Sequence, residues 1–222
     1  MRWTSLLSVL FCFAVASVAA ADRPNVLFIA VDDLRPELRC YGAAHIHSPN
    51  IDRLAREGMR FTQAYAAAAI CSPTRAAILT GKSPARLDMT IWHEGAVRGG
   101  SKNKRLLEAK AEANLPLAEV TLAELFKKQN YFTAHIGKWH LGKAAFYPET
   151  QGYDVNIGGT YWGAPTTFHW PYRGPWGKND PELRYVPVGP GKPGDYLTDQ
   201  LTDHALWIIA QQKNRPFFFS LW

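Results

Sequence analysis

The sequence predicts an α/β fold, built on a mostly parallel sheet with helices on both faces. Two observations lead to this fold class. Short runs of consecutive apolar residues, at residues 26–31, at residues 131–136 and in RPFFFSLW, are typical of parallel strands buried on both sides. Segments with the helical spacing of apolar side chains lie between these runs. Strands that alternate with helices favour parallel pairing through crossover connections.

The first predicted strand, residues 26–31, ends abruptly at two adjacent acids, Asp32 and Asp33. A short amphipathic helix follows in SPNIDRLAREGMRF. Ser48 can cap the N-terminus of this helix, Pro49 suits its first position, and Gly58 can end it.

A second unit of helix and strand begins at Thr121. Thr121 and Glu124 have the spacing of a capping box, and residues 131–136 form the next predicted strand. The last unit joins a helix to the strand in RPFFFSLW. The apolar face of that helix carries Leu197, Leu201, Ala205, Ile208 and Ile209.

Residues 144–196 separate these two units and are rich in Gly, Pro, Trp and Tyr. A long segment with turn-forming and aromatic residues favours an ordered excursion beside a binding face over a linker.

The composition predicts a folded chain and gives no support for nucleic-acid binding. Of the 222 residues, 47% are apolar and 13% aromatic, which is enough to bury a core. The formal net charge of +6 is mild and its bases are scattered. The one basic cluster, residues 98–105, is interpreted as a solvated loop.

Residues 1–21 have the features of a secretory signal peptide: Arg2, an apolar run over residues 6–16, and small residues before the expected cleavage site. The apolar run is shorter than the roughly 20 residues that span a bilayer. No later stretch is long and apolar enough to span. We therefore expect a secreted or periplasmic mature chain without a membrane span.

The mature chain keeps two cysteines, Cys40 and Cys71. A disulfide between them is one open interpretation for an exported protein. Cys71, however, begins CSPTRAAILTG, in which Ser72 can cap a helix, Pro73 suits its first position and Gly81 can close it. Because a helix N-terminus favours negative charge, this segment predicts a site for an anion.

Polar residues thus fall after predicted strands or at the start of a predicted helix in three places: Asp32 with Asp33, the Cys71 segment, and GKWH at residues 137–140. Open α/β sheets bind ligands at such positions. Each cluster alone also has an ordinary explanation. The acids suit a cap or a solvated turn, Lys138 and His140 suit the surface, and Cys71 suits a small buried position.

Four stretches in register carry a family resemblance. CSPTR, residues 71–75, resembles the Cys-x-Pro-x-Arg signature of the type I sulfatases, in the alkaline-phosphatase superfamily. PNVLFIAVDDLRPELRCYG, SPNIDRLAREGMRFTQAYA and GKWHLGK resemble the same family in the same order, and the four cover most of residues 24–143. The resemblance implies an exported sulfuric-ester hydrolase, with a sulfated glycan as the expected substrate.

In this family the signature cysteine is oxidised after translation to Cα-formylglycine. The resemblance therefore makes Cys71 the precursor of the nucleophile and implies a formylglycine-generating or sulfatase-maturating enzyme as a partner. One hydroxyl of the hydrated aldehyde attacks sulfur, and the other then loses its proton and expels sulfate. By the same resemblance, Arg75 would hold the hydrate, Lys138 would bind the hydrate and sulfate, and His140 would assist proton transfer.

The resemblance also assigns a calcium ion to Asp32 and Asp33, whose hard carboxylate oxygens suit that cation. One departure bears on the whole site. The family's later segments supply a substrate-binding His, further calcium ligands and another Lys, and the sequence has no counterpart of them.

Residues 22–222 are therefore expected to be the N-terminal part of a sulfatase catalytic domain, incomplete at its C-terminus and inactive alone. On this interpretation the strand in RPFFFSLW forms an unpaired edge with exposed aromatic surface.

Two other functions stay open at this point. One is a phosphodiesterase or phosphonate hydrolase of the same superfamily, and the other is a non-catalytic relative that binds sulfated glycans. Four aromatic or imidazole side chains are weak candidates for a sugar pocket, although loop packing explains them equally well: Trp92, His93, His169 and Trp170.

Overall fold

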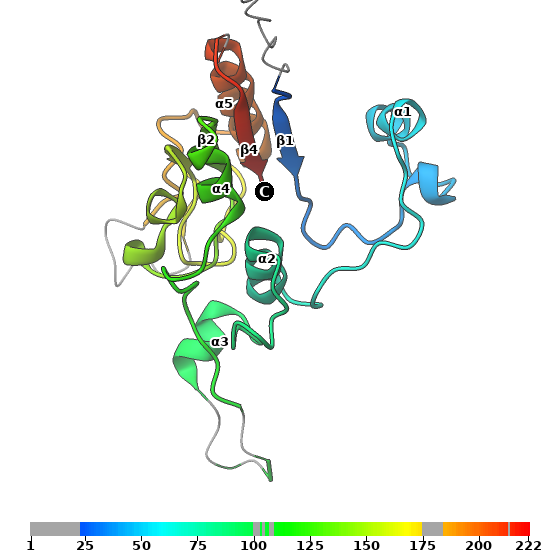
Figure 1. Cartoon of the computed structure of the whole chain (residues 1–222). Coiled ribbons are helices and arrows are strands. Elements are labelled where there is room, and N and C mark those ends of the chain that lie inside the picture. The colour runs from blue at the N-terminus through cyan, green and yellow to red at the C-terminus, as the bar shows by residue number, and fades with distance from the viewer. Residues whose placement is uncertain (1–22, 100–102, 104, 107–108, 175–183, 213) are drawn as a thin grey trace, which may run out of the picture.

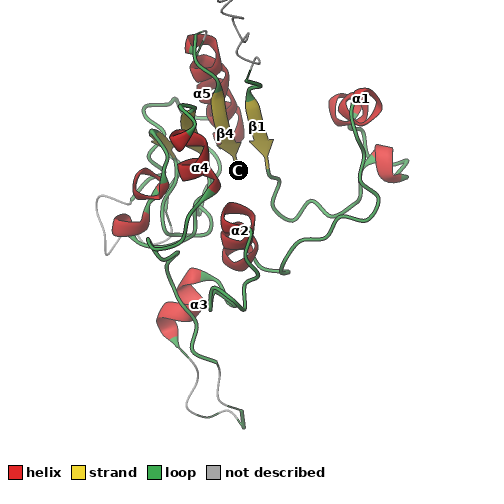
Figure 2. Ribbon diagram, viewed as in Figure 1, coloured by secondary structure: helices red, strands yellow, loops and turns green. Residues whose placement is uncertain are grey.

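The structure is a computed structural model that describes residues 23–99, 103, 105–106, 109–174, 184–212 and 214–222. The expected signal peptide, residues 1–21, lies outside the described residues. Within them, one sheet of four strands has the order β1-β4-β2-β3, and every pair is parallel. The strands are β1 (Val26–Ile29), β2 (Phe132–Ile136), β3 (Val155–Ile157) and β4 (Phe217–Leu221). The predicted parallel sheet is confirmed (Figures 1 and 2).

Helices cover both faces of this sheet, as predicted. On one face, α2 (Cys71–Thr80) and α4 (Leu122–Lys128) pack with Phe218 and the partly buried Val26 and Phe28 of β1. On the other face, α5 (Leu197–Gln211) packs Ala205 and Ile208 against β2 and β4. The capping box of Thr121 and Glu124 at the start of α4 is present.

The expectation of an exposed, unpaired last strand is wrong. β4 lies in the middle of the sheet, hydrogen-bonded to β1 on one side and to β2 on the other. Phe217, Phe218 and Phe219 are all buried, because their alternating side chains enter the cores on both faces. The last element in sequence order is thus a central strand in space, and β1 and β3 are the edge strands of the described sheet.

The described part of residues 144–196 is ordered and has its own small core. It contains η2 (Ala144–Phe146), η3 (Pro148–Gln151) and β3. Its apolar residues gather with the start of α5 in a cluster of five buried side chains: Trp162, Tyr172, Val186, Val188 and Leu197. This segment is therefore an excursion that packs back on the sheet, and the short strand within it was not predicted.

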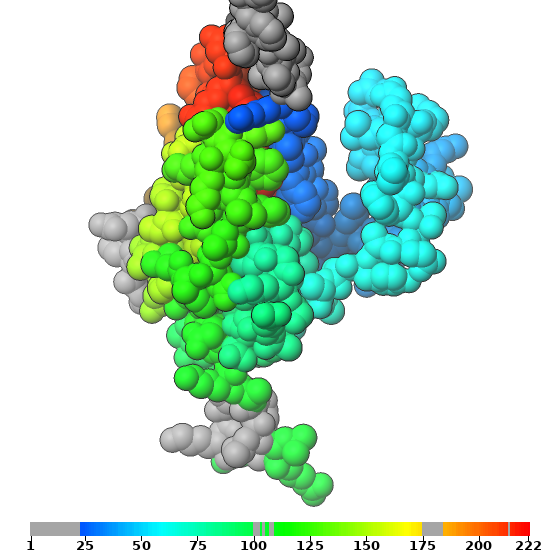
Figure 3. All heavy atoms as spheres, viewed as in Figure 1, coloured from blue at the N-terminus to red at the C-terminus, as the bar shows by residue number. Residues whose placement is uncertain are grey.

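Residues 35–65 are packed very differently. They contain η1 (Arg39–Tyr41) and α1 (Pro49–Glu57), and Figure 3 shows them as a lobe that stands to one side of the rest of the molecule. Apolar side chains of this lobe are largely open to solvent, with Met59 79% and Tyr65 85% exposed. One further helix, α3 (His93–Arg98), lies below α2 in Figure 1. Among the described residues, no helix combines the length and the apolar character needed to cross a membrane.

Candidate active site

The parallel sheet places its polar strand ends at one edge. β1, β2 and β4 run in the same direction, so Asp32, residues 137–140 and Trp222 follow their strands at the same end of the sheet. Helix α2 lies below this end (Figure 1). The predicted clusters are therefore brought together by topology, although they are far apart in sequence.

Cys71 is the first residue of α2, and Ile70 is the N-cap residue. The predicted capping role of Ser72 is wrong, because its hydroxyl is used elsewhere. Ser72 Oγ donates to the His140 carbonyl oxygen at 2.7 Å and accepts from the His93 backbone N–H at 3.1 Å. This fully buried hydroxyl joins α2 to the start of α3 and to the loop after β2.

Arg75 lies one turn into α2 and its side chain is only 3% exposed. Its guanidinium donates to Asp32 Oδ1 at 2.9 Å and to the Lys138 carbonyl oxygen at 2.5 Å. The Arg75 Cζ atom also lies 4.5 Å from the centroid of a Trp222 ring. Such a buried cation is held by a carboxylate, a carbonyl and an aromatic face. Arg75 thus fixes the ends of three strands relative to α2.

Asp32 pairs with two cations at once. Its second oxygen, Oδ2, accepts from Lys138 Nζ at 2.7 Å. Burial would raise the pKa of the Asp32 carboxyl, but Arg75 and Lys138 outweigh burial and hold this pKa below its ordinary value. The Lys138 side chain is 23% exposed, whereas that of Arg75 is nearly inaccessible. Of the two cations, Lys138 is therefore the one that a soluble anion can reach.

His140 has a left-handed backbone, with φ of 60°, which is unusual for a residue with a side chain. Its Nε2 donates to Glu94 Oε2 at 2.6 Å. Burial would lower the pKa of the imidazole, but its interactions with Cys71 and Glu94 raise the pKa above its ordinary value. The pKa of the Glu94 carboxyl is lowered in return, since contact with His140 outweighs the effect of burial.

The Cys71 thiol lies among these groups. Burial would raise its pKa, but the neighbouring His140 imidazole and Lys138 ammonium lower the pKa below its ordinary value. Neither Cys71 nor Cys40 forms a disulfide. The structure therefore brings together Asp32, Cys71, Arg75, Lys138 and His140.

Asp33 is not part of this network. It is exposed and has a left-handed backbone, with φ of 56°. Calcium takes about 6–8 oxygen ligands, and both oxygens of Asp32 are engaged by cations. Among the described residues, no group of three or more His, Cys, Asp or Glu side chains is arranged to hold a metal. Asp32 and Asp33 have the right donor chemistry, but they do not form a complete calcium site.

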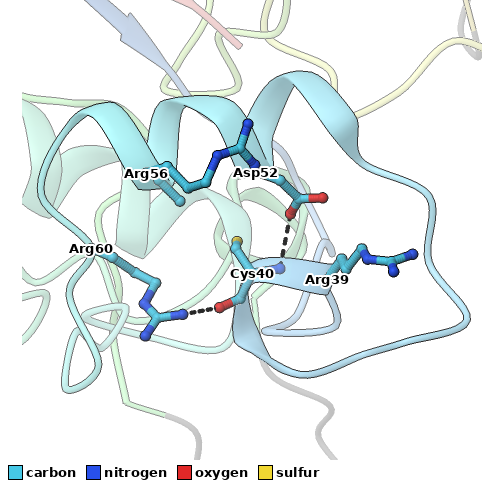
Figure 4. A pocket seen from close by; sticks show the side chains of 6 residues that line it. Arg39, Cys40, Asp52, Arg56 and Arg60 are labelled. Carbon is cyan, nitrogen blue, oxygen red and sulfur yellow. Dashed lines mark hydrogen bonds between the residues drawn. The ribbon is translucent and has the colours of Figure 1, made fainter.

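A pocket of about 600 Å³ lies elsewhere, in the lobe of residues 35–65. Arg39, Arg56 and Arg60 line it, but Figure 4 shows their guanidinium groups pointing in three different directions. The carboxylate of Asp52 accepts from the Cys40 backbone N–H at 2.8 Å. Because its charged groups do not converge, this pocket does not form a second anion site.

The weak aromatic candidates have structural roles or remain exposed. His93 is buried, and its Nδ1 is hydrogen-bonded to the Ala113 carbonyl oxygen at 2.6 Å. His169 is exposed and pairs through its backbone with Tyr196. The sequence missed the bridging role of Ser72, and it missed Glu94 and Trp222 altogether. No local motif marks Glu94 or Trp222.

The chain matches the Sulfatase family over residues 24–222. It is 43% identical to human (Homo sapiens) steryl-sulfatase over 134 residues, which cover 60% of this chain and 22% of that protein. Among solved structures, Ps i-CgsB in complex with k-i-k-neocarrahexaose has a TM-score of 0.68 and 27% identity, covering 89% of this chain and 44% of that chain.

Another structure, BT4656 in complex with its substrate D-glucosamine-2-N,6-O-disulfate, has a TM-score of 0.57 and 28% identity, over 89% of this chain and 33% of that chain. The chain spans about a quarter of the length of the curated relatives that it matches, from 20% to 29%. With the match over residues 24–222, the parallel sheet and the cluster around Cys71, the chain belongs to the type I sulfatase family of the alkaline-phosphatase superfamily.

Proposed function

We propose that residues 22–222 are the N-terminal part of the catalytic domain of an exported sulfuric-ester hydrolase, with Cys71 as the precursor of a formylglycine nucleophile. The observation that carries the proposal is the convergence of Cys71, Lys138, Arg75 and His140 at one end of the sheet, in a chain of the sulfatase family. When formed, the hydrated aldehyde supplies one hydroxyl that attacks sulfur and a second whose deprotonation expels sulfate.

Each side chain of this cluster has a role that follows from its position. Lys138, partly exposed beside Cys71, binds the sulfate group and offsets the negative charge that grows on it. Arg75 is too buried to meet a substrate directly, so it acts by holding the Lys138 backbone and Asp32. His140, which interacts with residue 71, accepts or returns a proton there.

The substrate class and the metal are also proposals. The sulfated sugar bound by BT4656 supports a sulfated glycan as the substrate. Calcium is proposed to bind at Asp32 and Asp33, together with oxygen ligands from outside the described residues, and none of the roles above depends on it.

The modification is tested by expressing the chain with a formylglycine-generating enzyme and analysing its peptides with an aldehyde-reactive probe. We expect an aldehyde at residue 71. Cys40 lies in RCYGA, without the Pro and Arg spacing, and is the internal control that stays a thiol. Thiol alone at both positions, in a host that modifies a known sulfatase, would refute the modification.

The reaction class is tested separately, on an active protein that contains this domain. We expect hydrolysis of an aryl sulfate to be faster than hydrolysis of the phosphate ester of the same phenol. A preference for the phosphate ester would favour a phosphodiesterase or phosphonate hydrolase. Binding of a sulfated glycan without hydrolysis would favour a non-catalytic relative.

N-terminal sequencing of the exported protein tests the signal peptide, and we expect the mature chain to begin at residue 22.

A further inference from the structure

The cluster contains one ionisable partner to which the family signature gives no role, Glu94 on α3. Its carboxylate contacts the imidazole directly, with Oε2 at 2.6 Å from His140 Nε2. The two side chains are only 4% and 19% exposed, so water does not replace this contact. Because a carboxylate only accepts hydrogen bonds, Nε2 must carry a proton.

The Glu94 carboxylate is itself held in place. Its other oxygen, Oε1, accepts from the Gly163 backbone N–H at 3.3 Å. The backbone of Gly163 also lies close to the imidazole, since a Cβ atom there would come within 2.6 Å of His140 Cε1. Glu94 and Gly163 therefore confine the imidazole from two sides, and the second contact requires glycine.

The His140 backbone is fixed as firmly as its ring. Its N–H donates to the Thr160 carbonyl oxygen at 2.9 Å, and its carbonyl oxygen accepts from Ser72 Oγ at 2.7 Å. The ring has little freedom to turn between these anchors. Its second nitrogen, Nδ1, is buried and makes no hydrogen bond of acceptable geometry within the described chain. Titratable groups face the imidazole from two elements: Glu94 and His93 on α3, and Cys71 on α2.

We propose that Glu94 is a positioning residue for His140. Glu94 keeps the proton on Nε2 and fixes the ring plane, which leaves Nδ1 as the nitrogen that exchanges a proton with the group at position 71. A base oriented by a third group is a general arrangement for activating a nucleophile. The contribution to turnover rests on the proposed sulfatase function, whereas the arrangement of the three side chains does not.

The experiment measures alkylation of the unmodified Cys71 thiol by iodoacetamide against pH, by peptide mass spectrometry on the full 222-residue chain. In Glu94→Gln, we expect the Cys71 profile to move to higher pH and the rate at pH 7 to fall roughly three- to ten-fold, since His140 would stabilise the thiolate less. Glu94→Asp should lie between this variant and the unsubstituted chain.

Two controls separate positioning from stability. Cys40, in the lobe of residues 35–65, is the internal reference whose profile should not move. Glu119→Gln removes a carboxylate that pairs with Lys82, away from this cluster, and should leave the Cys71 profile unchanged. A Glu94→Gln chain that melts earlier but keeps the original Cys71 profile would show a merely structural role and overturn the proposal.

A second measurement needs no variant. In the unsubstituted chain, at a pH where the His140 imidazole is neutral, its ¹⁵N shifts should place the proton on Nε2, and a neutral ring with its proton on Nδ1 would overturn the proposal. Neither readout depends on turnover. Failure of a longer protein that contains this domain to hydrolyse sulfate esters would therefore refute the proposed function alone, and an unmoved thiol profile would refute the role of Glu94 alone.

Discussion

The cluster around Cys71 and the lobe of residues 35–65 share three kinds of side chain, arginine, carboxylate and free cysteine, yet they are built in opposite ways. In the cluster, Arg75 is buried and makes contact with Asp32, Lys138 and Trp222. In the lobe, the arginines lining the pocket are exposed and point apart.

The difference between the two regions lies in their supports, not in their residue types. The cluster stands on the ends of three paired strands and on α2, whereas η1 and α1 pack mainly on each other. Similar side chains become a site only where rigid elements bring them to a common point.

The largest expected change in stability comes from comparing two phenylalanines, one in each region. Phe219 is fully buried in β4, whereas Phe61 in the lobe is 62% exposed. Phe219→Ala should cost about 3–5 kcal/mol of unfolding free energy because it opens a cavity in the core. Phe61→Ala should cost no more than about 0.5 kcal/mol. Urea unfolding of both variants checks this, and equal costs would contradict the distinction between the regions.

Two serines give the next largest effect. Ser72→Ala should cost about 2 kcal/mol, because it leaves the His140 carbonyl and the His93 N–H without their buried partner. Ser48→Ala in the lobe removes a contact to Asp52 at 3.2 Å and should cost about 1 kcal/mol or less. Chemical denaturation measures both. A larger loss for Ser48→Ala would show that the lobe is the better-supported region.

Acid should lower the free energy of unfolding by about 1 kcal/mol, because protonated carboxyls no longer attract their cationic partners and these ion pairs are partly exposed. Asp32 and Glu94 have lowered pKa values, so their stabilisation is present above the pKa values of the unfolded chain and is lost as pH falls through the folded ones.

His140 has the opposite sign. Its raised pKa means that its contribution is full below the unfolded value and is lost as pH rises through the folded one. The cluster is therefore most stable at a pH above the unfolded pKa values of the two carboxyls and below that of the imidazole. Unfolding of Asp32→Asn against pH should show a flatter acid limb than that of the unsubstituted chain. An unchanged acid limb would mean that Asp32 does not stabilise the folded cluster.

Calcium should have the smallest effect on the 222-residue chain. With two carboxylates, of which Asp32 is already paired with two cations, we expect a Kd on the order of 1 mM, so about 2 mM free calcium would add roughly 0.6 kcal/mol. Asp33→Asn should abolish this gain without changing stability in the absence of calcium, since Asp33 is exposed. Calorimetric titration and thermal melts with magnesium as the control measure it. Micromolar binding would show that the described residues already form a sufficient calcium site.

The sequence predicted those parts of the fold that depend on local pattern. Consecutive apolar residues marked β1, β2 and β4, and the spacing of Thr121 and Glu124 marked the start of α4. The position of β4 was predicted wrongly, because sheet order depends on crossover connections and not on order along the chain. The strand β3 was missed, since three residues are too few to show a pattern.

The same limit applies to the site. Cys71, Arg75, Lys138, His140 and Asp32 were predicted from motifs and do come together. Asp33 does not join the network, because its left-handed backbone leaves it exposed beside the strand end. Glu94 is one acid among many in the sequence, and only the packing of α3 against the loop after β2 shows that it meets His140.

The contacts of Trp222 also have a consequence in time. Its carbonyl oxygen accepts from the Lys138 N–H at 3.1 Å, and its ring lies against Arg75, so the cluster cannot close until this residue has been made. Trp222 follows Cys71 by 222 − 71 = 151 residues. At synthesis rates of about 5–20 residues per second, this separation lasts roughly 8–30 seconds. During that interval the Cys71 segment lacks its contacts with Trp222, and the proposed maturation enzyme would meet a cluster that is not yet closed.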